Sequence, residues 1–170
     1  ARSIGVIVKD GFVALNYHTV AGMAVVKAYL HGNPQTYISD GYLSVDETKD
    51  LIVISVPELK GPAAYIEGIT FPADGKAVTM VTNVSNRRFR AIAGVMAGQK
   101  EVGGIMMPQI ISNGDEDCTN GPLFYNGGVV GFITAGYLDR KFYSYAIIGS
   151  DLKRLLNRSF IIKNYNSLRD

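Results

Sequence analysis

The sequence has very few cysteines and histidines, the residues that form disulfides and bind zinc. It contains one cysteine, Cys118, two histidines and no tryptophan. A single cysteine excludes an internal disulfide framework and is consistent with a reducing compartment. The cysteine and histidines do not have the spacing of a metal site, and no phosphate-binding loop or cofactor motif is present. We therefore expect neither a metal nor a cofactor.

Strong charge and long apolar runs are also missing. The net charge is +2 over 170 residues, which is too mild to indicate a nucleic-acid or membrane partner by itself. The longest apolar runs are far shorter than the roughly 20 residues of a membrane-spanning helix, so no membrane contact is expected. A hydrophobic content of 47% against 19% charged residues predicts a full core in one large domain or two small ones.

Short segments typical of β-strands, separated by turns, make up most of the chain. We expect strands at residues 3–8, 12–17, 24–30, 36–38, 42–45 and 49–57, and again at 77–82, 87–96, 103–107, 129–134 and 142–148. A capping serine, an early acid and late bases predict a short helix over 150–156. Turn signals at this spacing indicate an all-β fold in sandwich or barrel form, with the Pro- and Gly-rich stretch 58–75 between its halves.

The single cysteine lies in a polar, Gly-rich loop that runs from Ser112 to Phe124. A cysteine that only fills a core would not normally be found there. Backbone N–H groups of such a loop can stabilise a thiolate, and later an oxyanion on a bound acyl group. The alternative is that Cys118 is an ordinary residue of a surface loop.

Three polar residues, His18, Asp50 and Cys118, each follow or precede an apolar strand-like run. A nucleophilic thiol needs a base within hydrogen-bond reach, and the base gains from an acid that fixes its tautomer. The order His, Asp, nucleophile across two β-rich halves is that of chymotrypsin-like enzymes. Taken singly, His18 could be an ordinary surface histidine and Asp50 an ordinary acid of a turn.

The chain resembles the chymotrypsin-like cysteine proteases of plus-strand RNA viruses. Residues 12–18, 49–57 and 78–83 resemble matching strands of the potyvirus NIa protease, and residues 128–136 are similar to the segment after the nucleophile in enterovirus 2A proteases. The nidovirus 3C-like proteases belong to the same broad class. The resemblance implies two antiparallel β-barrels with a short C-terminal helix, divided into 1–70, a linker at 71–77, and 78–170. It also implies His18 as base, Asp50 as third member and Cys118 as nucleophile.

The same resemblance implies what the protein meets in the cell. Its substrates would be segments of a viral polyprotein, cut in the host-cell cytoplasm after release from a replicase polyprotein. Related proteases often bind RNA, so Arg87, Arg88 and Arg90 leave weak RNA binding open, with a solvated strand face as the alternative. The rival function is a catalytically inactive, protease-like β-barrel module that binds peptide or RNA.

The nucleophile loop departs from the family pattern. One extra residue follows Cys118, and no glycine comes directly after it. If the Gly-Pro pair is aligned instead, Thr119 takes the nucleophile position. We prefer Cys118 because a thiol ionises far more readily than a hydroxyl. We expect the backbone N–H of Cys118, with that of Asp117 or Glu116, to form the oxyanion hole.

The expected specificity pocket departs as well. Family members that cut after Gln or Glu usually carry a histidine where this chain has Ile133. Burying a glutamine amide unpaired would cost about 1–3 kcal/mol, so Gln is not favoured. We expect Asn113 on one wall, and Phe132, Ile133, Thr134 and Ala135 on the other.

Overall fold

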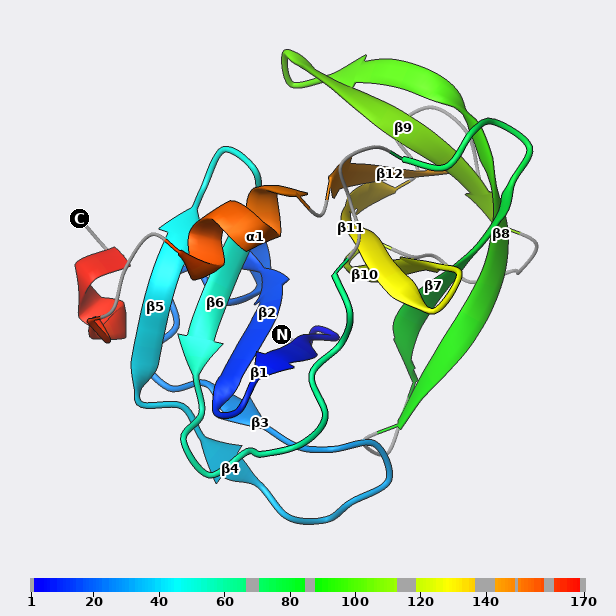
Figure 1. Cartoon of the computed structure of the whole chain (residues 1–170). Helices are drawn as coiled ribbons and strands as arrows, with labels where there is room; N and C mark the ends of the chain where they lie inside the picture. The colour runs from blue at the N-terminus through cyan, green and yellow to red at the C-terminus, as the bar shows by residue number, and fades with distance from the viewer. Residues whose placement is uncertain are drawn as a thin grey trace.

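The first half of the chain forms an open barrel of short antiparallel strands (Figure 1). This computed structural model describes residues 2–66, 71–84, 88–112, 119–136, 143–148, 150–157 and 161–168. A four-stranded sheet has the order β1-β2-β6-β5, and β3 and β4 pair separately. The bounds are β1 Val6–Lys9, β2 Phe12–Asn16, β3 Lys27–Ala28, β4 Tyr37–Ile38, β5 Gly41–Asp46 and β6 Leu51–Ser55, with a 3-10 turn η1 at Tyr17–Thr19.

The second half forms a closed antiparallel barrel with the strand order β10-β11-β12-β9-β8-β7. Its strands are β7 Ala77–Val84, β8 Arg88–Val102, β9 Ile105–Ser112, β10 Gly121–Tyr125, β11 Gly128–Gly136 and β12 Tyr143–Ile148. The all-β double-barrel fold expected from the sequence is therefore confirmed. Strand β10 was not expected, because its Gly-Pro start resembles a loop, and β8 and β9 are longer than their apolar cores indicate.

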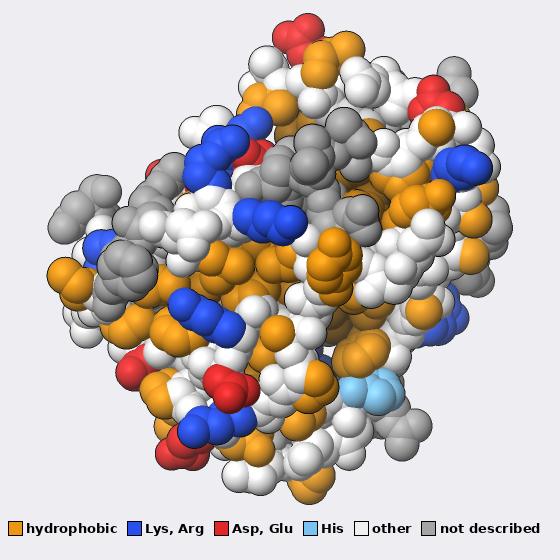
Figure 2. All heavy atoms as spheres, in the orientation of Figure 1, with side chains coloured by type: hydrophobic (Ala, Val, Ile, Leu, Met, Phe, Trp, Pro, Cys, Tyr) orange, Lys and Arg blue, Asp and Glu red, His pale blue; other side chains and the backbone are white. Residues whose placement is uncertain are grey.

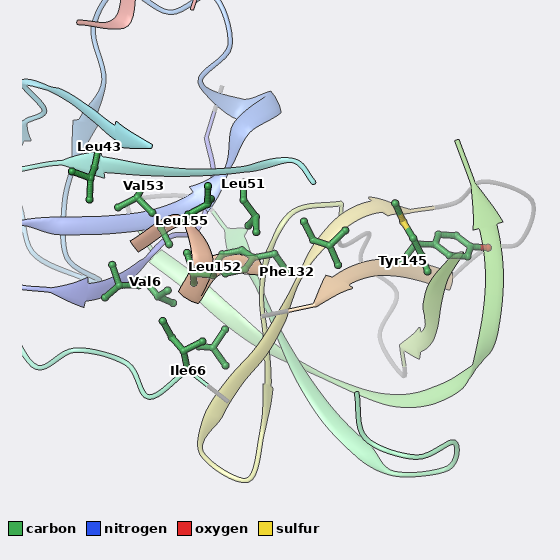
Figure 3. Packing of buried hydrophobic residues seen from close by; sticks show 14 residues of the cluster. Val6, Leu43, Leu51, Val53, Ile66, Phe132, Tyr145, Leu152 and Leu155 are labelled. Atoms are coloured by element: carbon green, nitrogen blue, oxygen red, sulfur yellow. The ribbon is translucent and has the colours of Figure 1, made fainter. Parts of the chain in front are cut away.

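Alternation along β11 sends side chains into two different cores. Ile133 faces the interior of the closed barrel with Met80 and Ile110, whereas Phe132 faces the first half and joins a shared cluster with Leu51. This follows from the two-residue period of a strand. Figure 3 shows Phe132 near Leu51 and Leu152 in the shared cluster. Because both halves contribute to one core, they are held in a fixed relative position.

The C-terminal segment returns to the first half of the molecule. Helix α1, Ser150–Leu156, lies where the sequence predicts, and its buried Leu152 and Leu155 join the shared cluster. The tail then pairs with β5, since the Tyr42 and Lys163 backbones exchange hydrogen bonds of 2.9 and 2.8 Å. The residues after β12 thus pack on the first half of the molecule, where the side chains of Leu152 and Leu155 are buried. Within the described residues, no helix is long and apolar enough to cross a membrane.

Candidate active site

His18 is presented by the turn that ends β2. The strand stops at Asn16, and η1 places the imidazole beyond the sheet, with the Val20 N–H donating to the Tyr17 carbonyl at 3.0 Å. The His18 side chain is 46% exposed. It is therefore held at its backbone and remains open to solvent on one side, as a base that must meet a substrate requires.

Asp50 lies in the turn between β5 and β6, directly before β6. Its φ of 54° is in the left-handed region, which a non-glycine residue adopts at a cost of about 1–3 kcal/mol. The turn is held by two hydrogen bonds: the Asp50 N–H donates to the Glu47 carbonyl at 3.2 Å, and the Asp50 carbonyl accepts from the Tyr17 N–H at 3.0 Å. This backbone conformation places the carboxylate beside His18.

The two side chains are in direct contact. The distance from His18 Nδ1 to Asp50 Oδ2 is 2.7 Å, and the His18 backbone N–H donates to Asp50 Oδ1 at 2.8 Å. A carboxylate only accepts, so Nδ1 carries the proton in this contact and the neutral ring leaves Nε2 as its acceptor. The expectation that His18 and Asp50 come together thus agrees with the structure, and the pair can act as an oriented base.

Thr134 reaches the same carboxylate from the second barrel. Its hydroxyl donates to Asp50 Oδ2 at 2.6 Å. The register of β11 with β12 shifts between Ile133 and Ala135, and this bulge leaves Thr134 outside regular pairing. Thr134, which we expected in a substrate pocket, thus uses its hydroxyl proton to hold the acid.

Asn16, which sequence reasoning missed, also contacts the acid. Its side chain is fully buried, and Nδ2 donates to Asp50 Oδ2 at 3.0 Å and to the Ile133 carbonyl at 2.7 Å. Its Oδ1 accepts from the Gly121 N–H at 2.8 Å. A buried amide has no pattern in a single sequence, so only its place two residues before His18 could have indicated it.

Two members of the expected pocket wall on β11 have buried side chains. Phe132 and Ile133 are both 0% exposed, in the shared core and the barrel core respectively. Adjacent strand residues point to opposite faces, so the two side chains do not line one open pocket. Ala135 is partly buried and packs against the shared cluster.

Residues 113–118 of the predicted nucleophile loop lie outside the described residues. This applies to Asn113, Glu116, Asp117 and Cys118, and Arg87 of the basic run is outside as well. The ends of the loop are described: Ser112 is buried at the end of β9, and Thr119 is exposed. Asn120 Oδ1 accepts from the Ser3 hydroxyl at 3.3 Å. Gly121, the first residue of β10 after the loop, donates its N–H to Asn16.

A cavity of about 1100 Å³ adjoins this region. Its walls are mostly apolar and include Val20 and Met23, which follow His18, and Ser3, which is bonded to Asn120. Arg2 and Lys27 add positive charge to the lining. The dimensions suit a bound organic group or peptide side chain.

The described surface gives little sign of a metal or a concentrated basic patch. No group of three His, Cys, Asp or Glu side chains suited to a metal ion occurs among the described residues. Figure 2 shows lysine and arginine side chains scattered over one face of the molecule rather than gathered together. Arg90 is exposed.

Comparison with known proteins identifies the fold. No protein-family model matches the sequence, and no curated protein matches it. The chain is similar to the Rv3671c protease of M. tuberculosis in its active form, with a TM-score of 0.78, 18% identity, and coverage of 95% of this chain and 75% of that chain. For the inactive form the TM-score is 0.74 and the identity 18%, with coverage of 92% of this chain and 83% of that chain. For an inactive Ser-to-Ala variant from strain H37Rv the TM-score is 0.70 and the identity 18%, with coverage of 91% and 80%. At this identity the likeness shows the fold: a chymotrypsin-like double β-barrel, with no support for the viral 3C-like branch in particular.

Proposed function

We propose that the chain is a cysteine endopeptidase that uses Cys118 as nucleophile, His18 as base and Asp50 as the residue that orients the base. The observation that carries the proposal is the 2.7 Å contact between His18 Nδ1 and Asp50 Oδ2. The imidazole in this contact is partly exposed, and the fold is shared with the Rv3671c protease.

The position of Cys118 in the sequence supports its role. It precedes Gly121 by three residues, a stretch of chain that spans at most about 11 Å. Gly121 is hydrogen-bonded to Asn16, which also contacts Asp50. The chain therefore limits how far the thiol can lie from Gly121, and this is compatible with a reaction at the His18–Asp50 pair. Thr119 lies even nearer in sequence to Gly121, but its hydroxyl is a far weaker nucleophile with histidine as the only base.

The proposed reaction forms and breaks bonds in two stages. The Cys118 sulfur bonds to the carbonyl carbon of the substrate as its proton passes to His18 Nε2, and the oxyanion accepts hydrogen bonds from the N–H groups of Cys118 and of Asp117 or Glu116. The C–N bond then breaks as His18 gives the proton to the leaving amine. Water attacks the thioester, His18 takes a proton from that water, and the acid is released as the thiol re-forms.

The finer assignments rest on the sequence resemblance alone. They make viral polyprotein segments the proposed substrates and the host cytoplasm the proposed site of action. Weak RNA binding through Arg87, Arg88 and Arg90 is proposed on the same basis. Apart from the resemblance, the largely apolar lining of the cavity beside Val20 and Met23 supports the binding of an apolar substrate side chain.

The second candidate is an inactive module of the same fold that binds peptide without cleaving it. The cavity favours this candidate too, because a lining that is largely apolar binds a peptide whether or not chemistry follows. The two functions are separated by the reactivity of Cys118, because only a nucleophile paired with His18 gains reactivity from the imidazole.

The deciding experiment is cleavage of a peptide library, read by mass spectrometry. Wild-type protein should cut peptides, and Cys118→Ala and His18→Ala should each remove detectable cleavage while circular dichroism shows an intact fold. Thr119→Ala is the matched control and should retain activity. Loss of cleavage in Thr119→Ala with retention in Cys118→Ala would reassign the nucleophile. No cleavage, with alkylation of Cys118 by iodoacetamide no faster than that of free cysteine, would favour the binding module.

A further inference from the structure

The hydrogen bonds of Asn16 join three separated segments at one point. The amide contacts Asp50 before β6, the Ile133 carbonyl on β11, and the Gly121 N–H at the start of β10. The first of these segments belongs to the first half and the other two to the closed barrel. Asn16 therefore links the acid of the first half to the residue that ends the nucleophile loop of the second.

The orientation of the amide is fixed by its surroundings. Nδ2 faces two acceptors, a carboxylate oxygen and a carbonyl, and Oδ1 faces an N–H donor. Rotating the amide by half a turn would place oxygen against oxygen and N–H against N–H, leaving buried polar groups unsatisfied. Because the Asn16 side chain is 0% exposed, bulk water cannot replace the hydrogen bonds that such a rotation would break. Both N–H groups of the amide and one acceptor position of its oxygen are thus used.

Gly121 is as constrained as its partner. Its φ is +103°, and a Cβ there would lie 2.7 Å from the Val81 carbonyl oxygen. Only glycine fits such an approach, so the backbone is pressed against β7 while its N–H points to Asn16. The end of the nucleophile loop is thus held at a defined distance from Asp50.

We propose that Asn16 is a positioning residue that sets Gly121, which follows the predicted nucleophile Cys118 by three residues, and the His18–Asp50 pair in register across the two barrels. It contacts neither the substrate nor the reacting atoms. The inference rests on the proposed function, because the register matters for chemistry only if Cys118 and His18 react together. Removing the amide should misplace the base relative to the thiol even where the chain still folds.

The first test is Asn16→Ala, measured as kcat and KM on a cleaved peptide and as the rate of iodoacetamide alkylation of Cys118. We expect kcat to fall by about tenfold or more, because a lost hydrogen bond to a charged group amounts to at least that factor, with KM little changed. Ser44→Ala is the matched control. Ser44 is a buried polar residue of the same half that bonds the Leu155 carbonyl at 2.8 Å, and its loss should lower stability without changing kcat.

The second test, Asn16→Asp, has a readout that a purely structural role would not move. The new carboxyl group keeps an acceptor for Gly121 but can donate to Asp50 only when protonated. Asp50, with His18 behind it, is the titratable neighbour, and the other contacts are main-chain groups. Two close carboxylates resist joint ionisation. The ratio of variant to wild-type kcat should therefore fall as pH rises from about 5 to 8.

A third readout separates this inference from the proposed function. The His18 Nδ1 proton in its short contact with Asp50 should give a far-downfield proton resonance in wild-type protein, and Asn16→Ala should broaden or shift it. Wild-type protein that shows the resonance but cleaves nothing would overturn the proposed function alone. An unchanged resonance in Asn16→Ala, a flat pH ratio in Asn16→Asp, or an effect on unfolding temperature only would overturn the positioning role.

Discussion

The Asp50 carboxylate is the most heavily bonded side chain of the site. Oδ2 accepts from His18, Asn16 and Thr134, and Oδ1 accepts from the His18 backbone N–H. A carboxylate with this many donors has little freedom to rotate, so it fixes both the position and the tautomer of the imidazole. The donors come from both halves, which makes the orientation of His18 depend on how the halves meet.

Replacing Asp50 with Asn tests the tautomer directly. Asn tolerates the left-handed backbone conformation of Asp50, so the fold should persist. Its amide can donate to Nδ1 and thereby move the ring proton to Nε2, which then cannot accept. We expect kcat to fall by about 100-fold or more, and by more than in Asp50→Ala. Equal kcat values for the two variants would contradict the tautomer argument.

Thr134 gives a milder change at the same oxygen. Thr134→Val keeps the shape and removes the donor to Oδ2, while His18 and Asn16 remain bonded there. A hydrogen bond to a charged group contributes about 1.5–3 kcal/mol, so kcat should fall by roughly ten- to a hundredfold. Thr134→Ser retains the hydroxyl and should stay near wild type. Steady-state kinetics on one peptide compares the three proteins.

At the scale of elements, the tail depends on close backbone contact with β5. A Cβ at Gly41 would lie 2.2 Å from the Lys163 carbonyl oxygen, so the tail can pair there only because residue 41 is glycine. Further along, Tyr165 is 5% exposed and its hydroxyl contacts that of Ser39. The tail therefore completes the core of the first half.

Gly41→Ala should displace the tail. We expect the free energy of unfolding to fall by about 2 kcal/mol or more. We also expect added trypsin to cleave the C-terminal segment faster than in wild-type protein. Gly75→Ala is the control, because Gly75 also has a positive φ, +87°, but nothing lies within 4 Å of a Cβ there. If the two variants lose equal stability, backbone strain rather than the tail contact explains the loss.

Tyr165 makes the fold sensitive to alkaline pH. Burial raises the pKa of Tyr165 to about 12, from its ordinary 10.0. The unfolded chain ionises first, so this contribution to stability is fully present below pH 10 and is lost as pH rises through about 12, by roughly 2–3 kcal/mol in total. Urea unfolding should show a smaller loss between pH 9 and 12 in Tyr165→Phe than in wild type. Parallel curves for the two proteins would contradict this.

Elements that carry their own local signal were predictable, and contacts between distant elements were not. The helix Ser150–Leu156 follows from its cap and charges, and His18 and Asp50 stand out as polar residues at strand ends. The bulge at Thr134 depends on the pairing of β11 with β12, and the buried amide of Asn16 depends on main-chain groups more than a hundred residues away. The different cores of Phe132 and Ile133 follow from the alternation of β11, which the family resemblance does not contain.

At the scale of the molecule, the shared core is what aligns the site. Phe132 is fully buried between the halves, near Leu51 of β6 and Leu152 of α1 (Figure 3). Its chain neighbour Ile133 provides the carbonyl bonded to Asn16, and Thr134 provides the hydroxyl bonded to Asp50. Three consecutive residues of β11 thus supply one buried aromatic ring and two hydrogen bonds to the site.

Phe132→Ala should therefore reduce stability and activity together. Truncating a buried Phe costs about 3–5 kcal/mol, and the cavity would let β11 shift against Asp50, so kcat per folded molecule should also fall. Met96→Ala is the control: Met96 is 2% exposed but packs only within the barrel core, so it should lose stability and keep kcat. Phe132→Leu serves if the alanine variant does not fold. Urea unfolding and kinetics well below the unfolding midpoint give both quantities, and a kcat unchanged in the Phe132 variants would show that the site is aligned without the shared core.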